Sequence, residues 1–193
     1  MLSAGAVRAI RRREQGAALI EVLVSILIVS FGLLALAGLQ TKMNAALLES
    51  YQRAQALTLL EDMTQRIQAN QNQSVDYVAA SLGTGAADCT TLGTRAEQDR
   101  CEWSNALKGA AVTADGVNVG AMIGARGCIE QLQPANPASG ICQPAIYRVT
   151  VAWQGLNATV VPAASCGAGE YGSDDSFRKA VSARVIVPLP GCS

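Results

Sequence analysis

The sequence contains no histidine among its 193 residues, and only 4% of the residues are aromatic. Histidine is the most frequent general acid or base and a common metal ligand, so a serine or cysteine nucleophile would lack its usual partner. No CxxC pair occurs either, and zinc sites usually depend on such spacing. We therefore expect a protein that is not an enzyme and that holds no metal or cofactor.

Charged residues make up only 16% of the chain, and one long stretch has almost none. The 23 residues 17–39 include three polar side chains, which belong to Glu21, Ser25 and Ser30. A helix of this length and composition is long enough to cross a bilayer. Residues 1–16 carry four arginines and one acid, and basic residues beside a span favour the cytoplasmic side. The rest of the chain should therefore face outward.

Residues 17–193 contain 11 basic and 14 acidic side chains. A mildly acidic exported part is not typical of nucleic-acid-binding proteins, which present basic surfaces. We therefore expect no nucleic-acid partner. One alternative stays open, in which four basic residues from separate loops cluster in space: Arg95, Arg100, Lys108 and Arg126.

All six cysteines follow the apolar segment: Cys89, Cys101, Cys128, Cys142, Cys166 and Cys192. An even number of cysteines on the exported side indicates disulfides formed in an oxidising compartment. Six cysteines allow 15 pairings, which the sequence alone does not distinguish. Pairing of nearest neighbours is our prediction, and it gives Cys89–Cys101, Cys128–Cys142 and Cys166–Cys192.

The apolar segment differs from a secretory signal in length and in the order of its parts. Such a signal has a short apolar core followed by small residues at the cleavage site, whereas here Gly16 and Ala17 precede the run. Cleavage between them would keep the apolar helix and make Ala17 the new amino terminus. Glu21 lies four residues further on the same helical face, where its carboxylate can meet a free α-amino group. The simpler alternative is a plain anchor with Glu21 near the membrane interface.

The stretch GAALIEVLVSILIVSFGLLALAGLQ resembles the class III signal of type IV prepilins and type II secretion pseudopilins. The resemblance implies that a prepilin peptidase cuts after Gly16 and that Ala17 is N-methylated. It also implies that Glu21, fifth in the mature chain, sets the register of subunits in a filament.

Two further stretches, GCIEQ and YRVTVAW, together with the signal, resemble the PilV-type minor pilins. This implies a minor pilin that primes or enters a type IV pilus and supports pilus biogenesis, twitching motility and adhesion. Its expected partners are the prepilin peptidase, other minor pilins, the major pilin and the inner-membrane assembly platform. The protein would span the inner membrane once, with a periplasmic head, and reach the cell surface in the pilus. Two alternatives are a minor pseudopilin of a type II secretion system and a DNA- or receptor-binding tip subunit.

The expected fold is α+β, a pilin-like ladle in which a long helix packs on a small antiparallel sheet. Apolar residues spaced three or four apart extend the helix beyond the membrane to Gln73 and include Ala54, Leu57, Leu60, Met63 and Ile67. We divide the chain into a cleaved leader (1–16), a transmembrane half-helix (17–39), an amphipathic periplasmic half-helix (40–73) and a disulfide-bearing head (74–193).

Within the head, Thr94 and Glu97 have the spacing of a capping box, which predicts a short helix through Lys108 that ends at Gly109. Apolar and polar residues alternate in two stretches, which predicts strands over 146–153 and 181–187, and a further strand is predicted over 125–132, before a turn at PANPASG. We expect one buried face on this sheet, covered by the long helix.

Two smaller features have two interpretations each. Gly32 and Gly38 lower helix propensity, so they mark either a stretch that can unwind or a face for close helix packing. Glu170, Asp174 and Asp175 form an acidic cluster in a long loop, where a solvated turn is favoured over a calcium site.

Overall fold

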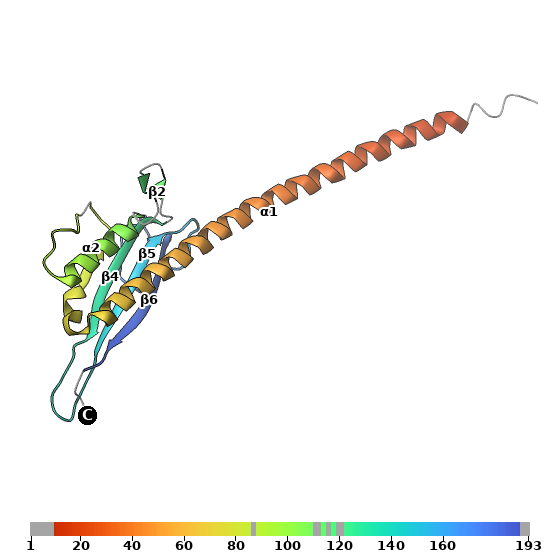
Figure 1. Cartoon of the computed structure of the whole chain (residues 1–193). Coiled ribbons are helices and arrows are strands. Elements are labelled where there is room, and N and C mark those ends of the chain that lie inside the picture. The colour runs from red at the N-terminus through yellow and green to blue at the C-terminus, as the bar shows by residue number, and fades with distance from the viewer. Residues whose placement is uncertain (1–9, 86–87, 110–112, 115–116, 119–121, 190–193) are drawn as a thin grey trace, which may run out of the picture. The chain divides into compact units, whose positions relative to one another are not determined.

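The computed structural model describes the backbone of residues 10–85, 88–109, 113–114, 117–118 and 122–189. It describes the side chains of residues 18–85, 88–109 and 122–189. The chain divides into two compact units, Met1–Leu47 and Leu48–Ser193, and one helix, α1 (Ile10–Ala69), continues from the first into the second. The remaining elements are η1 (Gln71–Tyr77), β1 (Ala79–Leu82), α2 (Arg95–Leu107), β2 (Thr113–Ala114), β3 (Val117–Asn118), β4 (Ile123–Gln133), β5 (Ala145–Gln154) and β6 (Arg178–Val187) (Figure 1).

The second unit is built on a four-stranded antiparallel sheet in the order β1-β4-β5-β6. The part of α1 that belongs to this unit packs on one face of the sheet, and α2 packs beside it (Figure 1). The predicted α+β arrangement of a long helix on a small antiparallel sheet is confirmed. The three predicted strands correspond to β4, β5 and β6, whereas β1 and the small β2–β3 hairpin were not predicted.

The main core lies between this sheet face and the two helices. Alternate residues of β5 point into it, since Tyr147, Val149, Val151 and Trp153 are all buried. Trp103 of α2 is also fully buried and lies directly over β4. A Cβ atom added at Gly127 would lie 2.2 Å from the Trp103 ring. The indole therefore needs a glycine at this position of the strand.

The face that α1 presents to the core differs from the predicted one. The buried positions are Gln52, Ala56, Leu60, Met63 and Ile67, at intervals of three or four residues. The last three were predicted, but Ala54 and Leu57 are exposed instead. Apolar residues occur on more than one face of this helix, so the sequence pattern did not identify the face that meets the sheet.

The ends of the two helices follow local chemistry. Thr94 accepts the backbone N–H of Glu97 at 3.2 Å, and the Glu97 side chain accepts the backbone N–H of Thr94 at 3.1 Å, so the predicted capping box is confirmed. Gly109, at φ +84°, follows α2 as the predicted stop. Helix α1 ends at Ala69, four residues before the predicted end of the long helix at Gln73. The chain then continues in the 3₁₀ turns of η1.

Part of the second face of the sheet is also covered, which corrects the expectation of a single buried face. The segment 155–177 folds back over it and brings Tyr171 and Cys166 onto Ala152 in a small second cluster. The Tyr171 hydroxyl donates to the carbonyl oxygens of Gly124 at 2.7 Å and Ala152 at 3.3 Å. The sequence signal for this face was weak because, apart from Ile146, the residues that β5 contributes to it are small or polar.

The buried Arg178, the first residue of β6, ties this segment to the sheet. Its guanidinium donates to the carbonyl oxygens of Pro162, Ala164 and Cys166, and it forms a 3.0 Å ion pair with Asp175. A buried guanidinium is tolerated here because a carboxylate and three carbonyl groups replace its water.

Two disulfides join described residues. Cys89–Cys101 is confirmed, and it links the loop before α2 to that helix. The other is Cys128–Cys166, which we call the sheet–loop disulfide. The predicted pairs Cys128–Cys142 and Cys166–Cys192 are therefore wrong. Cys142 is also disulfide-bonded, and Cys192 lies outside the described residues.

The reason for the different pairing is strand geometry. Cys128 lies five residues before the end of β4, and at about 3.3 Å per residue this places it roughly 17 Å from the turn that contains Cys142. A disulfide requires Cα atoms about 4.4–6.8 Å apart. The folded-back segment instead places Cys166 with its Cα atom 5.7 Å from that of Cys128.

Candidate functional site: the exposed amino-terminal helix

Residues 18–39 of α1 form an apolar helical surface that no described part of the chain covers. Large side chains along the whole segment, from Leu19 to Leu39, are exposed. By length and composition, α1 contains a segment able to cross a membrane, with a mean hydropathy of 2.7 in its most apolar window. A surface of this kind is stable only in lipid or against other apolar helices, because water disfavours it.

The hydroxyl groups in this segment are satisfied within the helix. Ser25 donates to the carbonyl oxygen of Glu21 at 2.7 Å, and Ser30 donates to that of Ile26 at 2.7 Å. These bonds let both serines sit in hydrocarbon without an outside partner. Among the described side chains, the Glu21 carboxylate is then the one polar group of the segment that the helix itself does not satisfy.

The predicted cleavage position, Gly16–Ala17, lies in the helical backbone of α1 five residues before Glu21. The side chains of residues 10–17 lie outside the described residues, as does the whole of residues 1–9. Cleavage and N-methylation therefore stay predictions. Since Ala17 and Glu21 are four apart in a continuous helix, they do lie on one helical face.

The two glycines of the apolar segment lie in uninterrupted helix. A Cβ atom added at Gly32 or Gly38 would meet no atom within 4 Å. Neither glycine is therefore needed for packing within the described chain. Both roles considered for them, unwinding of the helix and close helix packing, stay predictions.

The exposed apolar surface of α1 continues beyond the membrane-length segment. Met43, Leu47, Tyr51 and Leu57 are about half exposed or more, although Ala56 and Leu60 between and after them are buried against the sheet. The head therefore uses one face of the helix and leaves apolar side chains on other faces free of described contacts. Such side chains are available to neighbouring helices.

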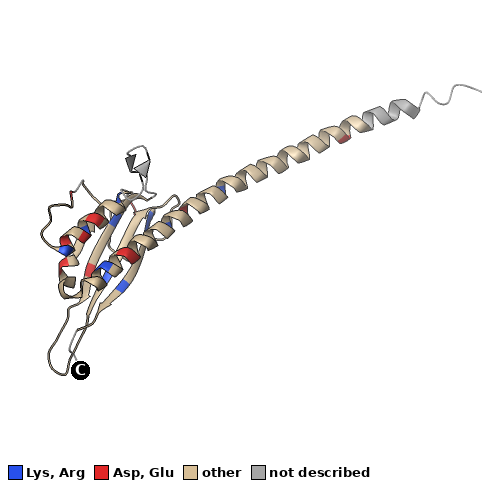
Figure 2. Cartoon of the chain, in the orientation of Figure 1, with Lys and Arg blue, Asp and Glu red and all other residues tan. Residues whose placement is uncertain are grey.

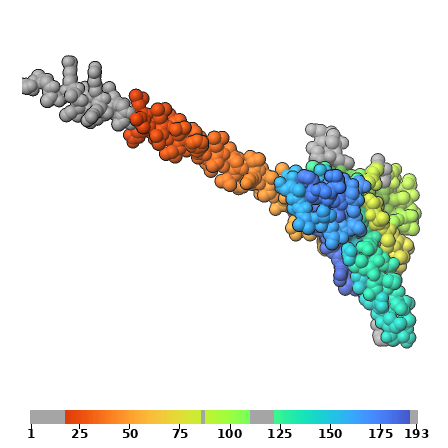
Figure 3. Space-filling model, turned by 180° about the vertical axis from the view of Figure 1, so that it is seen from behind, coloured from red at the N-terminus to blue at the C-terminus, as the bar shows by residue number. Residues whose placement is uncertain are grey.

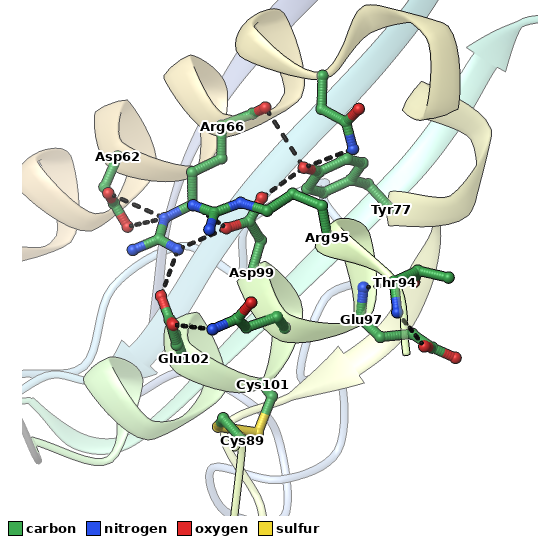
Figure 4. A network of polar contacts seen from close by, with 12 residues as sticks. Asp62, Arg66, Tyr77, Cys89, Thr94, Arg95, Glu97, Asp99, Cys101 and Glu102 are labelled. Carbon is green, nitrogen blue, oxygen red and sulfur yellow. Dashed lines mark hydrogen bonds and ion pairs between the residues drawn. A yellow bond between two sulfur atoms is a disulfide. The ribbon is translucent and has the colours of Figure 1, made fainter. Parts of the chain in front are cut away.

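A charge network fixes α2 to α1 (Figure 4). Asp99 of α2, whose side chain is only 2% exposed, accepts Arg66 of α1 at 2.8 Å and Arg95 at 3.0 Å. It also accepts the hydroxyl of Tyr77 at 2.5 Å. Arg66 pairs in addition with Asp62 at 3.1 Å and Glu102 at 2.7 Å. Figure 2 shows acidic and basic positions along α2 and along the part of α1 near it.

The helical pattern of the sequence places Arg66 and Asp62 on the solvent side of the helix and does not indicate this network. The spacing of Asp62 to Arg66, and of Arg95 to Asp99, would have suggested two ion pairs within helices. The cross-link between the helices depends on the packing of α2, which no local pattern gives.

The network changes the proton affinity of its members. Burial, together with the hydrogen bond to Asp99, raises the pKa of Tyr77 to about 12. Burial alone would lower the pKa of Arg66, but its bonds to Glu102, Asp62 and Asp99 raise it above the ordinary value. Both groups therefore keep their protons at neutral pH, and their bonds link α2 and η1 to α1.

The three acidic residues of the 155–177 segment bond to the backbone of that segment and to arginines of β4 and β6. Asp174 accepts the backbone N–H of Ser176 at 3.1 Å, which lowers the pKa of its carboxyl. Asp175 accepts the backbone N–H of Gly169 at 2.9 Å and pairs with Arg178. Glu170 pairs with Arg126 at 3.4 Å. Within the described ranges, no group of three or more metal-binding side chains occurs.

The four basic residues considered for a DNA-binding surface are each engaged within the head. Arg95 pairs with Asp99, and Arg126 pairs with Glu170. Arg100 donates to the carbonyl oxygen of Val78 at 3.2 Å, and Lys108 donates to that of Gly85. Two of the four are thus paired with carboxylates and two are bonded to backbone carbonyl groups.

No protein-family model matches the chain, and comparisons with curated proteins and with solved structures also give no match.

Proposed function

We propose that the chain is a minor pilin of the PilV type, which enters a type IV pilus or primes its assembly through α1. The observation that carries the proposal is the exposed apolar helix with one unsatisfied carboxylate, Glu21, in a chain whose leader has a prepilin-like cleavage position at Gly16–Ala17. Before assembly, this helix anchors the protein in the inner membrane with the head in the periplasm.

Glu21 acts in assembly by charge pairing. Cleavage after Gly16 creates a positive α-amino group at Ala17, one helical turn before the carboxylate. In the filament, Glu21 of one subunit pairs with the α-amino group of its neighbour. Removing one member of a pair buried in an apolar environment costs about 3–5 kcal/mol, because the other charge stays unpaired. The pair therefore favours one axial register over all others.

The apolar side chains of α1 beyond the membrane segment extend this contact. Met43, Leu47, Tyr51 and Leu57 are exposed in the single chain, and packing against neighbouring helices would cover them. Burying a large apolar side chain completely contributes about 1.5–3 kcal/mol. Within the head, the Arg66–Asp99 ion pair holds α2 on α1.

The test compares the incorporation of two carboxylate variants into sheared pili. Glu21→Ala should be cleaved normally but should be strongly depleted from pili, because the α-amino group of the neighbouring subunit stays unpaired. The matched control is Glu61→Ala, which removes an exposed carboxylate of the same helix outside the membrane segment and should be incorporated normally. Equal incorporation of both variants would refute the proposal for Glu21.

A minor pseudopilin of a type II secretion system would use the same helix and the same signal. The neighbouring genes distinguish the two, because pilus motor and minor-pilin genes favour the first assignment and secretin-linked export genes favour the second.

A further inference from the structure

Apolar side chains are exposed at one end of the four-stranded sheet, where β4 and β6 begin and β5 ends. Val160 is 92% exposed, and it is accompanied by four other exposed or half-exposed side chains, Ile123, Leu156, Val161 and Phe177. We call these five residues the sheet-end patch. Nothing in the proposed assembly through α1 uses them.

Backbone pairing brings the segments that carry the five residues to the same end of the sheet. Gln154 at the end of β5 pairs with Ile123 on one side and Arg178 on the other, so all three strands reach this end in one row. Just beyond the row, the N–H of Gly155 donates to the carbonyl oxygen of Phe177 at 2.8 Å. The N–H of Thr159 likewise donates to that of Ser176 at 2.7 Å.

The patch is also fixed to α1. The backbone N–H and the side-chain amide of Asn157 both donate to one carboxylate oxygen of Glu49, at 3.0 and 3.1 Å. Glu49 follows Leu39, the last residue of the apolar run, by ten residues. These ten residues span about 15 Å as a helix and no more than about 35 Å as an extended chain. The patch is therefore tethered close to the bilayer that holds the helix.

We propose that, before the subunit is assembled, the sheet-end patch contacts the headgroup region of the bilayer that holds residues 18–39. The inference rests on the membrane anchor in the proposed function but not on the pilus. The short link of ten residues from Leu39 to Glu49 keeps the patch near the lipid surface.

The chemistry of the patch fits a lipid surface better than a protein. Lys179 donates to the Thr159 hydroxyl at 2.9 Å, which places an ammonium group beside the patch, where it can meet anionic lipid phosphates. Stable protein interfaces use about 20–30 residues on each side, far more than these five. A tethered membrane contact needs less area because the anchor has already brought the two surfaces together.

The test uses the full chain in vesicles of zwitterionic and anionic phospholipid, with bromine on the acyl chains near the headgroup as a quencher of tryptophan. Val160→Trp places the probe in the patch, where an exposed position accepts it without repacking. Ile141→Trp is the matched control, because Ile141 is 56% exposed in the turn at the opposite end of the sheet. Figure 3 shows these two ends, the turn in turquoise and segment 155–177 in light blue. The native Trp103 and Trp153 are buried.

We expect bromine to quench the Val160→Trp emission several-fold more than the Ile141→Trp emission. Adding Leu156→Asp should abolish the difference. A third variant, Leu36→Trp, reports on the anchor itself, because Leu36 is 57% exposed and lies near the end of the span that is closer to the head. Equal, weak quenching at residues 160 and 141 with strong quenching at residue 36 would overturn this inference and leave the anchor intact. No quenching at residue 36 would refute the anchor and this inference with it. A blue shift of the Val160→Trp emission that grows with protein concentration, without quenching by bromine, would show that the patch contacts a second copy of the chain. That result would overturn the lipid contact.

Discussion

Replacing Asp99 by alanine tests whether the charge network around this carboxylate holds α2 on α1. The substitution removes a nearly fully buried carboxylate that accepts Arg66, Arg95 and the Tyr77 hydroxyl. Breaking a buried ion pair from one side costs about 3–5 kcal/mol. Arg66 is 24% exposed and keeps its bonds to Asp62 and Glu102, so the low end of this range applies. We expect a loss of about 3 kcal/mol in the free energy of unfolding, which for a unit of this size lowers Tm by about 6–12 °C.

The assay is thermal unfolding of the full chain in detergent, followed by near-ultraviolet circular dichroism of the buried tryptophans. Glu102→Ala is the matched control, because it removes another carboxylate bonded to Arg66 whose side chain is 39% exposed. Exposed ion pairs contribute about 0–1 kcal/mol, so this variant should unfold within a few degrees of the parent protein. Equal Tm values for the two variants would refute the conclusion that the buried carboxylate holds the helices together.

Three further predictions concern the head. The pKa of Tyr77 and that of Tyr171 are both raised to about 12, so the stability that depends on these protons is complete below pH 10 and is lost as pH rises through 12. The urea concentration at the unfolding midpoint should therefore fall between pH 10 and pH 12, and it should fall less steeply with pH in Tyr77→Phe than in the parent protein. The same pH dependence in both proteins would contradict the raised pKa of Tyr77. Gly127→Ala forces a methyl group into the Trp103 ring and should destabilise the head by about 1–3 kcal/mol, measured by urea unfolding. An unchanged free energy of unfolding would show that Trp103 is not closely packed on Gly127. Replacing both cysteines of the sheet–loop disulfide by serine should lower the free energy of unfolding by about 3–4 kcal/mol, given its span of 38 residues. No change in the urea midpoint would exclude a stabilising role.

Features encoded by neighbouring residues could be predicted from the sequence. The capping box of Thr94 and Glu97 determines the start of α2 without help from the rest of the chain. The alternation around Val149 predicted β5 because one of its faces meets a helix along its whole length. The apolar run that contains Glu21 is likewise a local property, so the sequence alone is enough to identify the candidate assembly helix.

Features that depend on contacts between distant residues could not be predicted. The four residues of β1 carry no alternation, and they form a strand because β4 pairs with them. Cys166 reaches Cys128 only because segment 155–177 folds over the sheet, which nearest-neighbour pairing cannot anticipate. Arg66 and Asp99 are 33 residues apart, and the position of α2 alone brings them together.

The central claim is that cleavage after Gly16 turns an anchored precursor into a subunit whose new amino terminus can pair with Glu21. Mass spectrometry of the amino-terminal peptide of the protein from its native cell tests this most directly. We predict a mature chain that begins at Ala17, with the mass of a methylated α-amino group. A native chain that keeps its arginine-rich leader, or that begins after Glu21, would contradict this claim.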